Sequence, residues 1–306
     1  MFGFLRSVQV DEDENIYIAD AEFIKIRICD RDGTHIRSFG RQGQGPGEIG
    51  WPSRMYLRAD NRIAIVDSRN RRFAYYSTEG ECLEEFSLAK HGSVIRAWPD
   101  SRGFIYGDIY DYSGGQRKSR LVKYDPDFEE EVAVLAEFED QMVLGEINPI
   151  LYRILCFVRT DDTIVWAKNQ EYCLNILSPS GEIVRTIYKE YDPIHISDAE
   201  KKRIEEERYS DGFTGSLKLV FPESYPPLYY LICDDQGKIY VRTYIQNEKG
   251  WLKWEVFDKE GRYILDFFHP AEDILFYIKN DKLYSMNQDN EEGIPHIRRY
   301  KMTWDM

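Results

Sequence analysis

The chain repeats one structural unit six times, and this repetition limits its possible folds more than any other feature. Each unit has an Asp-, Asn- or Gly-rich turn, an alternating strand, a loop, another strand, a D-x-x-G-like turn and a last strand. The second unit reads RADNRIAIVDS, RRFAYYS and TEGECLEEFSL. Such a unit cannot bury its own two faces, so the units must pack on one another.

The spacing of the units predicts a β-propeller. The alternating strand begins, in the six units, at Ile16, Ile63, Phe104, Ile164, Ile239 and Leu283. The steps between these residues are 47, 41, 60, 75 and 44 residues. Four-stranded propeller blades span about 40–50 residues, so three steps match directly and two carry insertions. We expect one all-β domain over residues 1–306, a six-bladed β-propeller with a short helical insertion at about 190–227 between blades 4 and 5.

Composition excludes several classes of protein. The 22 Tyr, 16 Phe and 6 Trp exclude a disordered chain, and aromatic rings suit the wedges between blades. A formal charge of −14 argues against electrostatic binding of nucleic acid, whether DNA or RNA. No apolar run approaches the roughly 20 residues of a membrane span. We therefore predict no nucleic-acid partner and no membrane span.

Two insertions place extra loops on one face of the expected propeller. In the longer one, Ser197 and Glu200 form a capping box that predicts a charged helix from Asp198 to Tyr209. The other insertion runs from Glu137 to Tyr152. Both join the outer strand of one blade to the inner strand of the next, on the face that also holds the loops between second and third strands. Loops on a rigid scaffold commonly bind ligands, so we expect function on this face.

Polar residues at equivalent strand ends are the candidate ligand-binding set at the channel mouth. They end the second strand of each unit: Asp20, Asp67, Asp108, Lys168, Arg242 and Asn287. Arg6 and Arg54, near the starts of inner strands, are expected to point toward the same mouth, and Trp51 and Tyr225 on adjoining loops offer stacking surface. One interpretation is Asp–Arg pairing that braces the loops, with Asn70 and Arg72 as local partners. The other is a mixed-charge funnel for a polar ligand, since charges in a narrow mouth are costly unless paired or liganded.

The other motifs in the sequence do not predict a phosphate site, a metal site or a catalytic group. Gly43–Gly47 imitates a phosphate loop, but a strand rather than a helix follows it. Asp11, Asp13, Asn15 and Glu22 have a calcium-loop spacing that overlaps a predicted strand. The five histidines are widely separated, and four of the five cysteines lie in apolar or alternating runs that predict small buried hydrophobes. We predict no metal site, no catalytic residue and no cofactor.

The run FGRQGQGPGEIGWPSRMYLRADNRIAIVDSRNRRFAYYSTEG resembles an NHL-type repeat junction. The chain is similar to a family of bacterial six-bladed β-propellers of NHL or TolB type. The likeness lies in the Gly43–Glu48 loop and in the segments GEIVRTIYKEYDPIHISDAEK and FPESYPPLYYLICDDQGKIYV. This resemblance implies the propeller fold and an exported location, and it implies no reaction because the family has no general activity.

The sequence favours a non-enzymatic, monomeric scaffold that binds a peptide, protein or glycan through its loop-rich face and channel mouth. The alternative is a hydrolase or lyase with a polar or metal-assisted site at the axial channel. The sixth unit ends after its third strand, and the first begins almost directly on its inner strand. We expect Met1 to be an internal start, preceded by an export signal and a closing strand. A last blade of three strands with an exposed edge is the alternative.

Overall fold

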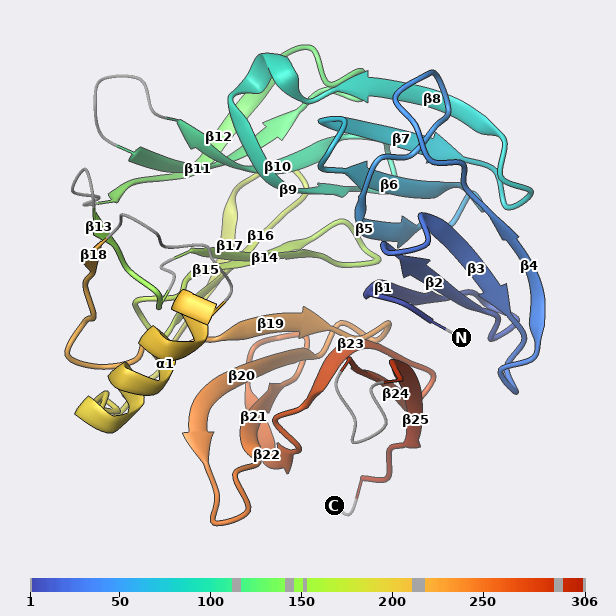
Figure 1. Cartoon of the computed structure of the whole chain (residues 1–306). Coiled ribbons are helices and arrows are strands. Elements are labelled where there is room, and N and C mark those ends of the chain that lie inside the picture. Colours follow the sequence, from blue (N-terminus) through green and yellow to red (C-terminus); the bar gives the residue numbers. More distant parts are fainter. Residues whose placement is uncertain are drawn as a thin grey trace.

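Six antiparallel sheets surround a central axis in the computed structural model, which describes residues 2–111, 117–140, 146–150, 153–210, 218–288 and 294–304 (Figure 1). The first sheet contains β1 (Leu5–Val10), β2 (Ile16–Asp20), β3 (Lys25–Cys29) and β4 (His35–Phe39). The second contains β5 (Pro52–Leu57), β6 (Ile63–Asp67), β7 (Arg72–Tyr76) and β8 (Cys82–Ser87). The third contains β9 (Ser93–Pro99), β10 (Ile105–Asp111), β11 (Arg117–Tyr124) and β12 (Glu131–Asp140), preceded by the 3-10 helix η1 (Ala89–His91).

The remaining three sheets complete the ring. The fourth contains β14 (Ile154–Val158), β15 (Ile164–Lys168), β16 (Cys173–Leu177) and β17 (Ile183–Tyr188). The fifth contains β19 (Tyr230–Cys233), β20 (Ile239–Gln246), β21 (Leu252–Phe257) and β22 (Tyr263–His269). The sixth contains β23 (Asp273–Lys279), β24 (Lys282–Asn287) and β25 (His296–Lys301). The inner strand β1 contacts both β5 and β23, so the first and last blades lie side by side (Figure 1). The predicted all-β, six-bladed propeller is confirmed.

Burial is greatest in the second strands of the blades and least in the outer strands, while the inner strands at the axis are only partly buried. The second strands β2 and β6 are buried at every residue, whereas the outer strands β4 and β8 are almost entirely exposed. Between blades 1 and 2, side chains from both sheets, among them Ile26, Met55 and Ile65, form one apolar cluster. Similar clusters occupy the interfaces that follow around the ring. Each sheet is therefore apolar on both faces because neighbouring blades cover both.

The sixth blade has three strands in the described part of the chain. The outer edge of β25 consequently pairs with no further strand there. It carries Arg298, Arg299 and Lys301, and charged side chains of this kind discourage pairing with another chain.

The two insertions lie against each other. Helix α1 (Asp198–Ser210) begins as predicted, because Ser197 Oγ accepts a hydrogen bond of 3.2 Å from the amide of Glu200. The short strand β13 (Glu146–Ile147) pairs in parallel with β18 (Lys218–Leu219), which joins the two insertions. In the described residues, no helix is long and apolar enough to cross a membrane.

Three predicted boundaries were wrong. The first insertion was expected from Glu137, but β12 continues to Asp140 because its acidic side chains pair with Lys118 and Arg120 on β11. Asp108 and Arg242 were expected at strand ends, but β10 and β20 continue past them to Asp111 and Gln246.

Candidate ligand-binding site

The central channel has two ends with different chemistry. Leu5 at the start of β1 pairs with Asp20 at the end of β2, so the predicted residues belong to the end where blades are connected to one another. We call this end the loop face. The opposite end, which we call the hairpin face, carries the turns between first and second strands and between third and fourth strands.

Asp67 holds the connection from blade 1 to blade 2. Its buried carboxylate accepts hydrogen bonds from the amides of Gly50 (2.7 Å) and Trp51 (2.9 Å). It also accepts bonds from the backbone and the side-chain amide of Asn70, at 3.2 and 2.8 Å. The Asn70 side chain donates in turn to the carbonyl of Gly43. Asn70 is therefore the bracing partner that the sequence predicted.

Arg72, the second predicted partner, lies opposite Asp67 in the β6–β7 pair and braces the same loop. Its guanidinium donates to the carbonyls of Gln44 (2.8 Å) and Gly45 (3.0 Å) and pairs with Glu85. The Gly43–Gly47 segment is consequently held by side chains of blade 2.

Asp20 plays the equivalent part in blade 1. It accepts hydrogen bonds from the amides of Gly3 (3.1 Å) and Phe4 (3.3 Å), and it lies 3.3 Å from the Arg27 guanidinium. In blade 4 this role belongs to Asn169, whose Oδ1 accepts the Arg153 amide at 2.9 Å.

Lys168 ends β15, as the sequence predicted. Its ammonium lies 5.0 Å from the ring centre of Phe138 on blade 3, in the interface between two blades rather than with the other mouth residues. The amide acceptor next to it in the sequence WAKN was the signal that could have identified Asn169.

The remaining predicted polar residues are also engaged. Asp108 is fully buried and lies 3.6 Å from Arg96 Nε. Asn287 donates a 3.0 Å hydrogen bond to Asp273. The acidic and amide side chains therefore brace the blades, and Asp20 and Asp108 each lie beside an arginine as the bracing interpretation predicted. The ligand funnel stays a prediction.

His269 lies beside this last group and predicts a pH dependence of stability. It is buried, 3.7 Å from Asp273, and burial lowers its pKa although the Asp273 carboxylate acts in the opposite direction. The fold therefore binds the imidazole proton less readily than the unfolded chain, whose pKa is about 6.5. The stability that follows from this difference is fully present above about pH 6.5, and it is lost as the pH falls through the lower pKa of the folded state.

We expect the stability lost between about pH 7 and pH 5 to be smaller in His269→Gln than in the parent protein. Urea melts at several pH values measure it. His35→Gln, at an exposed position on the hairpin face, is the control and should keep the parent slope. An unchanged slope in His269→Gln would contradict the assignment.

Five arginines from five successive blades gather at the loop-face end of the channel. Arg6 and Arg54 were predicted from the inner strands, and Arg242 from the second strand of blade 5. The structure adds Arg96 on β9 and Arg153 directly before β14, which sequence reasoning missed. The missed signal was an arginine near the start of the inner strands of blades 1 to 4, in SVIRAWP and YRILCF as in LRSVQV and PSRMYL.

Contacts connect these five arginines, which we call the arginine cluster. Arg54 donates to the carbonyl of Arg6 at 3.3 Å. Arg54 and Arg96 line the same narrow cavity of about 50 Å³ inside the channel. The guanidiniums of Arg153 and Arg242 lie 5.2 and 4.3 Å from the ring centre of Tyr229.

Burial and repulsion between neighbouring guanidinium groups both lower the pKa values of arginines in this cluster. Burial, followed by the charge of Arg54, lowers the pKa of Arg6. Burial, followed by the charge of Arg96, lowers the pKa of Arg153. Burial also lowers the pKa of Arg242, where the charge of Arg153 acts in the same direction and nearby tyrosines act against it. A concentrated positive charge thus lies at one mouth of an acidic protein.

Tyrosines from blade 5 and from the insertion before it border the cluster on one side. Tyr225 stacks on Tyr244 with ring centres 4.4 Å apart and an interplanar angle of 19°, and Tyr229 meets Tyr244 edge-on at 5.1 Å. Together with Arg242 and Arg203 they line a hollow of about 550 Å³ beside α1. Burial raises the pKa of Tyr244 to about 12, so its hydroxyl stays protonated near neutral pH.

Trp51, the other predicted stacking residue, lies elsewhere on the loop face. Its ring centre is 6.2 Å from that of Phe4, and the Arg69 guanidinium lies 5.9 Å away. It also packs against the apolar cluster between blades 1 and 2.

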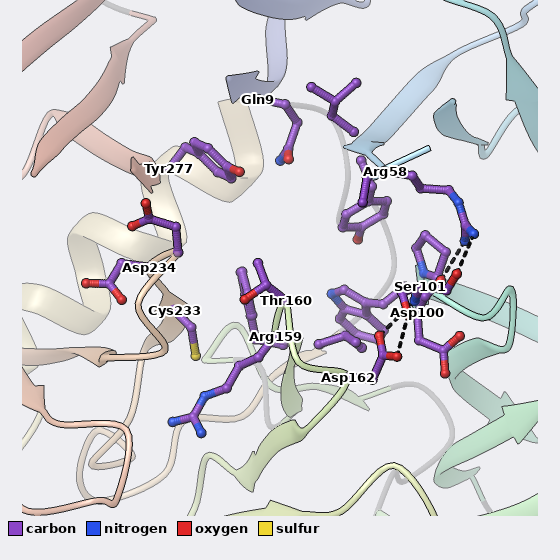
Figure 2. Close-up of a pocket in the computed structure, with 18 of the residues that line it drawn as sticks. Gln9, Arg58, Asp100, Ser101, Arg159, Thr160, Asp162, Cys233, Asp234 and Tyr277 are labelled. Atoms are coloured by element: carbon purple, nitrogen blue, oxygen red, sulfur yellow. Dashed lines mark hydrogen bonds between the residues drawn. The ribbon is translucent and has the colours of Figure 1, made fainter. Parts of the chain in front are cut away.

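The hairpin face contains a smaller cavity of about 190 Å³ (Figure 2). Asp162 accepts hydrogen bonds from the amide and hydroxyl of Ser101, at 2.7 and 2.6 Å. Arg58 donates to the carbonyl of Ser101, and the side chain of Arg159 extends away from Arg58 in Figure 2. Burial raises the pKa of the Cys233 thiol to about 12, which makes it a poor nucleophile at neutral pH. Much of the polar lining of this cavity therefore holds turns together.

Comparison with known proteins agrees with this architecture. Residues 4–152 match the sequence profile of a family described as a 6-bladed beta-propeller. The chain is similar to this propeller family. The resemblance predicted from the sequence is thereby confirmed.

Solved structures share the fold of this propeller at low sequence identity. A predicted exported protein of Bacteroides fragilis NCTC 9343 aligns with a TM-score of 0.58 and 13% identity, over 94% of this chain and 80% of that one. A Bacteroides vulgatus ATCC 8482 protein aligns with a TM-score of 0.58 and 8% identity, over 98% and 93%. Virginiamycin B lyase of Staphylococcus aureus aligns with a TM-score of 0.50 and 11% identity, over 98% and 85%. At these identities the likeness extends to the fold alone.

Proposed function

We propose that this chain is a non-enzymatic binding propeller that takes a peptide, a protein segment or a glycan in the mouth of its loop face. The single observation that carries the proposal is the hollow of about 550 Å³ formed by the tyrosines of blade 5 and helix α1. Ligand sites are concave, and they combine flat apolar surfaces with a few polar groups that fix orientation.

The tyrosines suit this role because they are held by the sheet rather than by a free loop. Tyr244 lies on β20, and Tyr229 precedes β19, where its amide donates a 2.8 Å hydrogen bond to the Arg242 carbonyl. A tyrosine fixed in this way offers a broad face and a hydroxyl at little entropic cost. Sugar rings and extended peptides both bind to such surfaces.

The proposal is tested by probing glycan and peptide arrays with the purified protein. We expect Tyr244→Ala to weaken binding to any captured ligand by about tenfold or more, as truncating an aromatic anchor does. Tyr188→Ala is the matched control, because Tyr188 is 74% exposed on the outer strand of blade 4. Equal binding by both variants and the parent protein would exclude the hollow as the ligand site.

An exported location is part of the same proposal. It is supported by the fold shared with the predicted exported protein of Bacteroides fragilis. Fractionating cells that carry the complete native gene tests it, and recovery of the protein in the cytoplasmic fraction alone would contradict it.

A further inference from the structure

The arginine cluster has almost no counter-charge. In the described part of the chain, Asp108 beside Arg96 is the one carboxylate within 4.0 Å of any of its five guanidiniums. The Nε atoms of Arg6, Arg153 and Arg242 are buried and donate no hydrogen bond there. Buried donors and like charges brought together cost free energy unless a ligand compensates them.

The other described acidic side chains near the mouth have partners of their own. Glu200, which lines the hollow beside α1 together with Arg242, forms a hydrogen bond with Tyr225. Asp20 and Asp67 accept backbone amides at the start of their blades, and Asp273 is occupied by Asn287, Ser285 and Tyr300. These carboxylates therefore accept hydrogen bonds from other groups and do not neutralise the arginine cluster, which keeps a net positive charge.

Irregular backbone pairing accompanies three of the arginines. The register shifts between Leu5 and Ser7 at Arg6, between Pro52 and Arg54, and next to Arg96 on β9. Such bulges redirect side chains and recur beside functional sites. In Figure 1 the strands concerned, β1, β5 and β9, lie next to one another around the axis.

We propose that the arginine cluster is a binding site for an oxyanion, namely a carboxylate, sulfate or phosphate group carried by the ligand of the loop face. Guanidinium groups donate paired hydrogen bonds that match the oxygens of these anions. Tyr229 lies under two of the guanidiniums and continues into the hollow beside α1, so the uncharged part of the ligand packs on the tyrosines. This inference rests on the proposed function and assigns the chemical class of its ligand.

Isothermal titration calorimetry at about 20 mM ionic strength tests it, with citrate, sulfate, inorganic phosphate and oligogalacturonate as probes and neutral oligogalactose as the comparison. We expect at least one anion to bind, the neutral sugar to bind more weakly, and the affinity to fall as salt rises. The four anions distinguish a carboxylate ligand from a sulfated or phosphorylated one.

The test variant is the double substitution Arg6→Met and Arg242→Met. Neither side chain makes a hydrogen bond or ion pair with the described residues, so removing their charges should leave the melting temperature unchanged or raise it. Anion affinity should fall by at least about tenfold. Arg262→Met is the control for each single substitution, because it removes one positive charge from a side chain that is 75% exposed on the hairpin face. Arg242→Lys keeps the positive charge but loses the paired N–H donors of the guanidinium, so it should lose part of the affinity for anions.

Three results would overturn the inference. The first is that no anion binds the parent protein, and the second is that the double variant binds anions as well as Arg262→Met does. An uncharged array ligand that is lost in Tyr244→Ala but kept in the double variant would reject the anion site while leaving the proposed function in place. If the double variant does not fold, Arg242→Lys and Arg6→Lys carry the same comparison.

Discussion

Replacing Asp67 with alanine is expected to lower the free energy of unfolding by about 2–4 kcal/mol. The substitution leaves the amides of Gly50 and Trp51 without an acceptor and releases Asn70 from its position. The entry to blade 2 should then lose its fixed geometry. Thermal and urea melts measure the effect.

Asp32→Ala is the matched control for Asp67, because the Asp32 side chain is 71% exposed in a hairpin turn. It should change stability by less than about 0.5 kcal/mol. Asp67→Asn should fall between the two, since it keeps one acceptor oxygen. If Asp67→Ala keeps the parent stability and instead loses ligand binding, Asp67 belongs to a binding funnel and the bracing assignment is wrong.

Replacing Glu255 with alanine is expected to cost about 3 kcal/mol or more, because it breaks a buried charge network between blades 4 and 5. Glu255 on β21 is 1% exposed and accepts a hydrogen bond from the hydroxyl of Tyr172 and one from the Lys189 ammonium. Burial, followed by the charge of Glu255, raises the pKa of Tyr172, so this hydroxyl remains a donor. Loss of the carboxylate leaves the buried Tyr172 hydroxyl without its acceptor and removes the counter-charge of Lys189.

Amide hydrogen exchange shows which blades are destabilised in this variant, and by how much. We expect faster amide exchange in β16 and β21 of Glu255→Ala, with blades 1 and 2 unchanged. Glu260→Ala in the neighbouring exposed turn is the control, and Glu255→Gln should retain part of the stability. Uniform acceleration in all blades would show instead that the propeller opens as a whole.

Much of the fold was predictable because short stretches of the sequence determine its strands, its turns and the start of its helix. Short apolar runs such as IAIVD and turns such as STEG predicted strands and hairpins, and their recurrence predicted the number of blades. The capping pair Ser197 and Glu200 likewise fixed the start of α1. Such signals lie within a few residues of the structure they determine.

The site was less predictable because it depends on which side chains meet across the ring. Asp67 and Asn70 are close in sequence, so their pairing was predicted correctly. Arg96 and Arg153 come from different blades, and their shared mouth follows from the closure of the ring rather than from any motif. The shift from Lys168 to Asn169 shows the same limit, since one residue in register decides whether a side chain faces a neighbouring blade or caps its own strand.

A crystallographic fragment screen tests most directly whether the loop-face mouth receives the ligand. Crystals are soaked with carboxylate, sulfonate, sugar and aromatic fragments, and the bound positions are compared. Anionic fragments are predicted to lie against Arg153 and Arg242, with ring fragments on the tyrosines beside α1. Fragments found only in the hairpin-face cavity of Figure 2, or an empty loop-face mouth, would contradict the assignment.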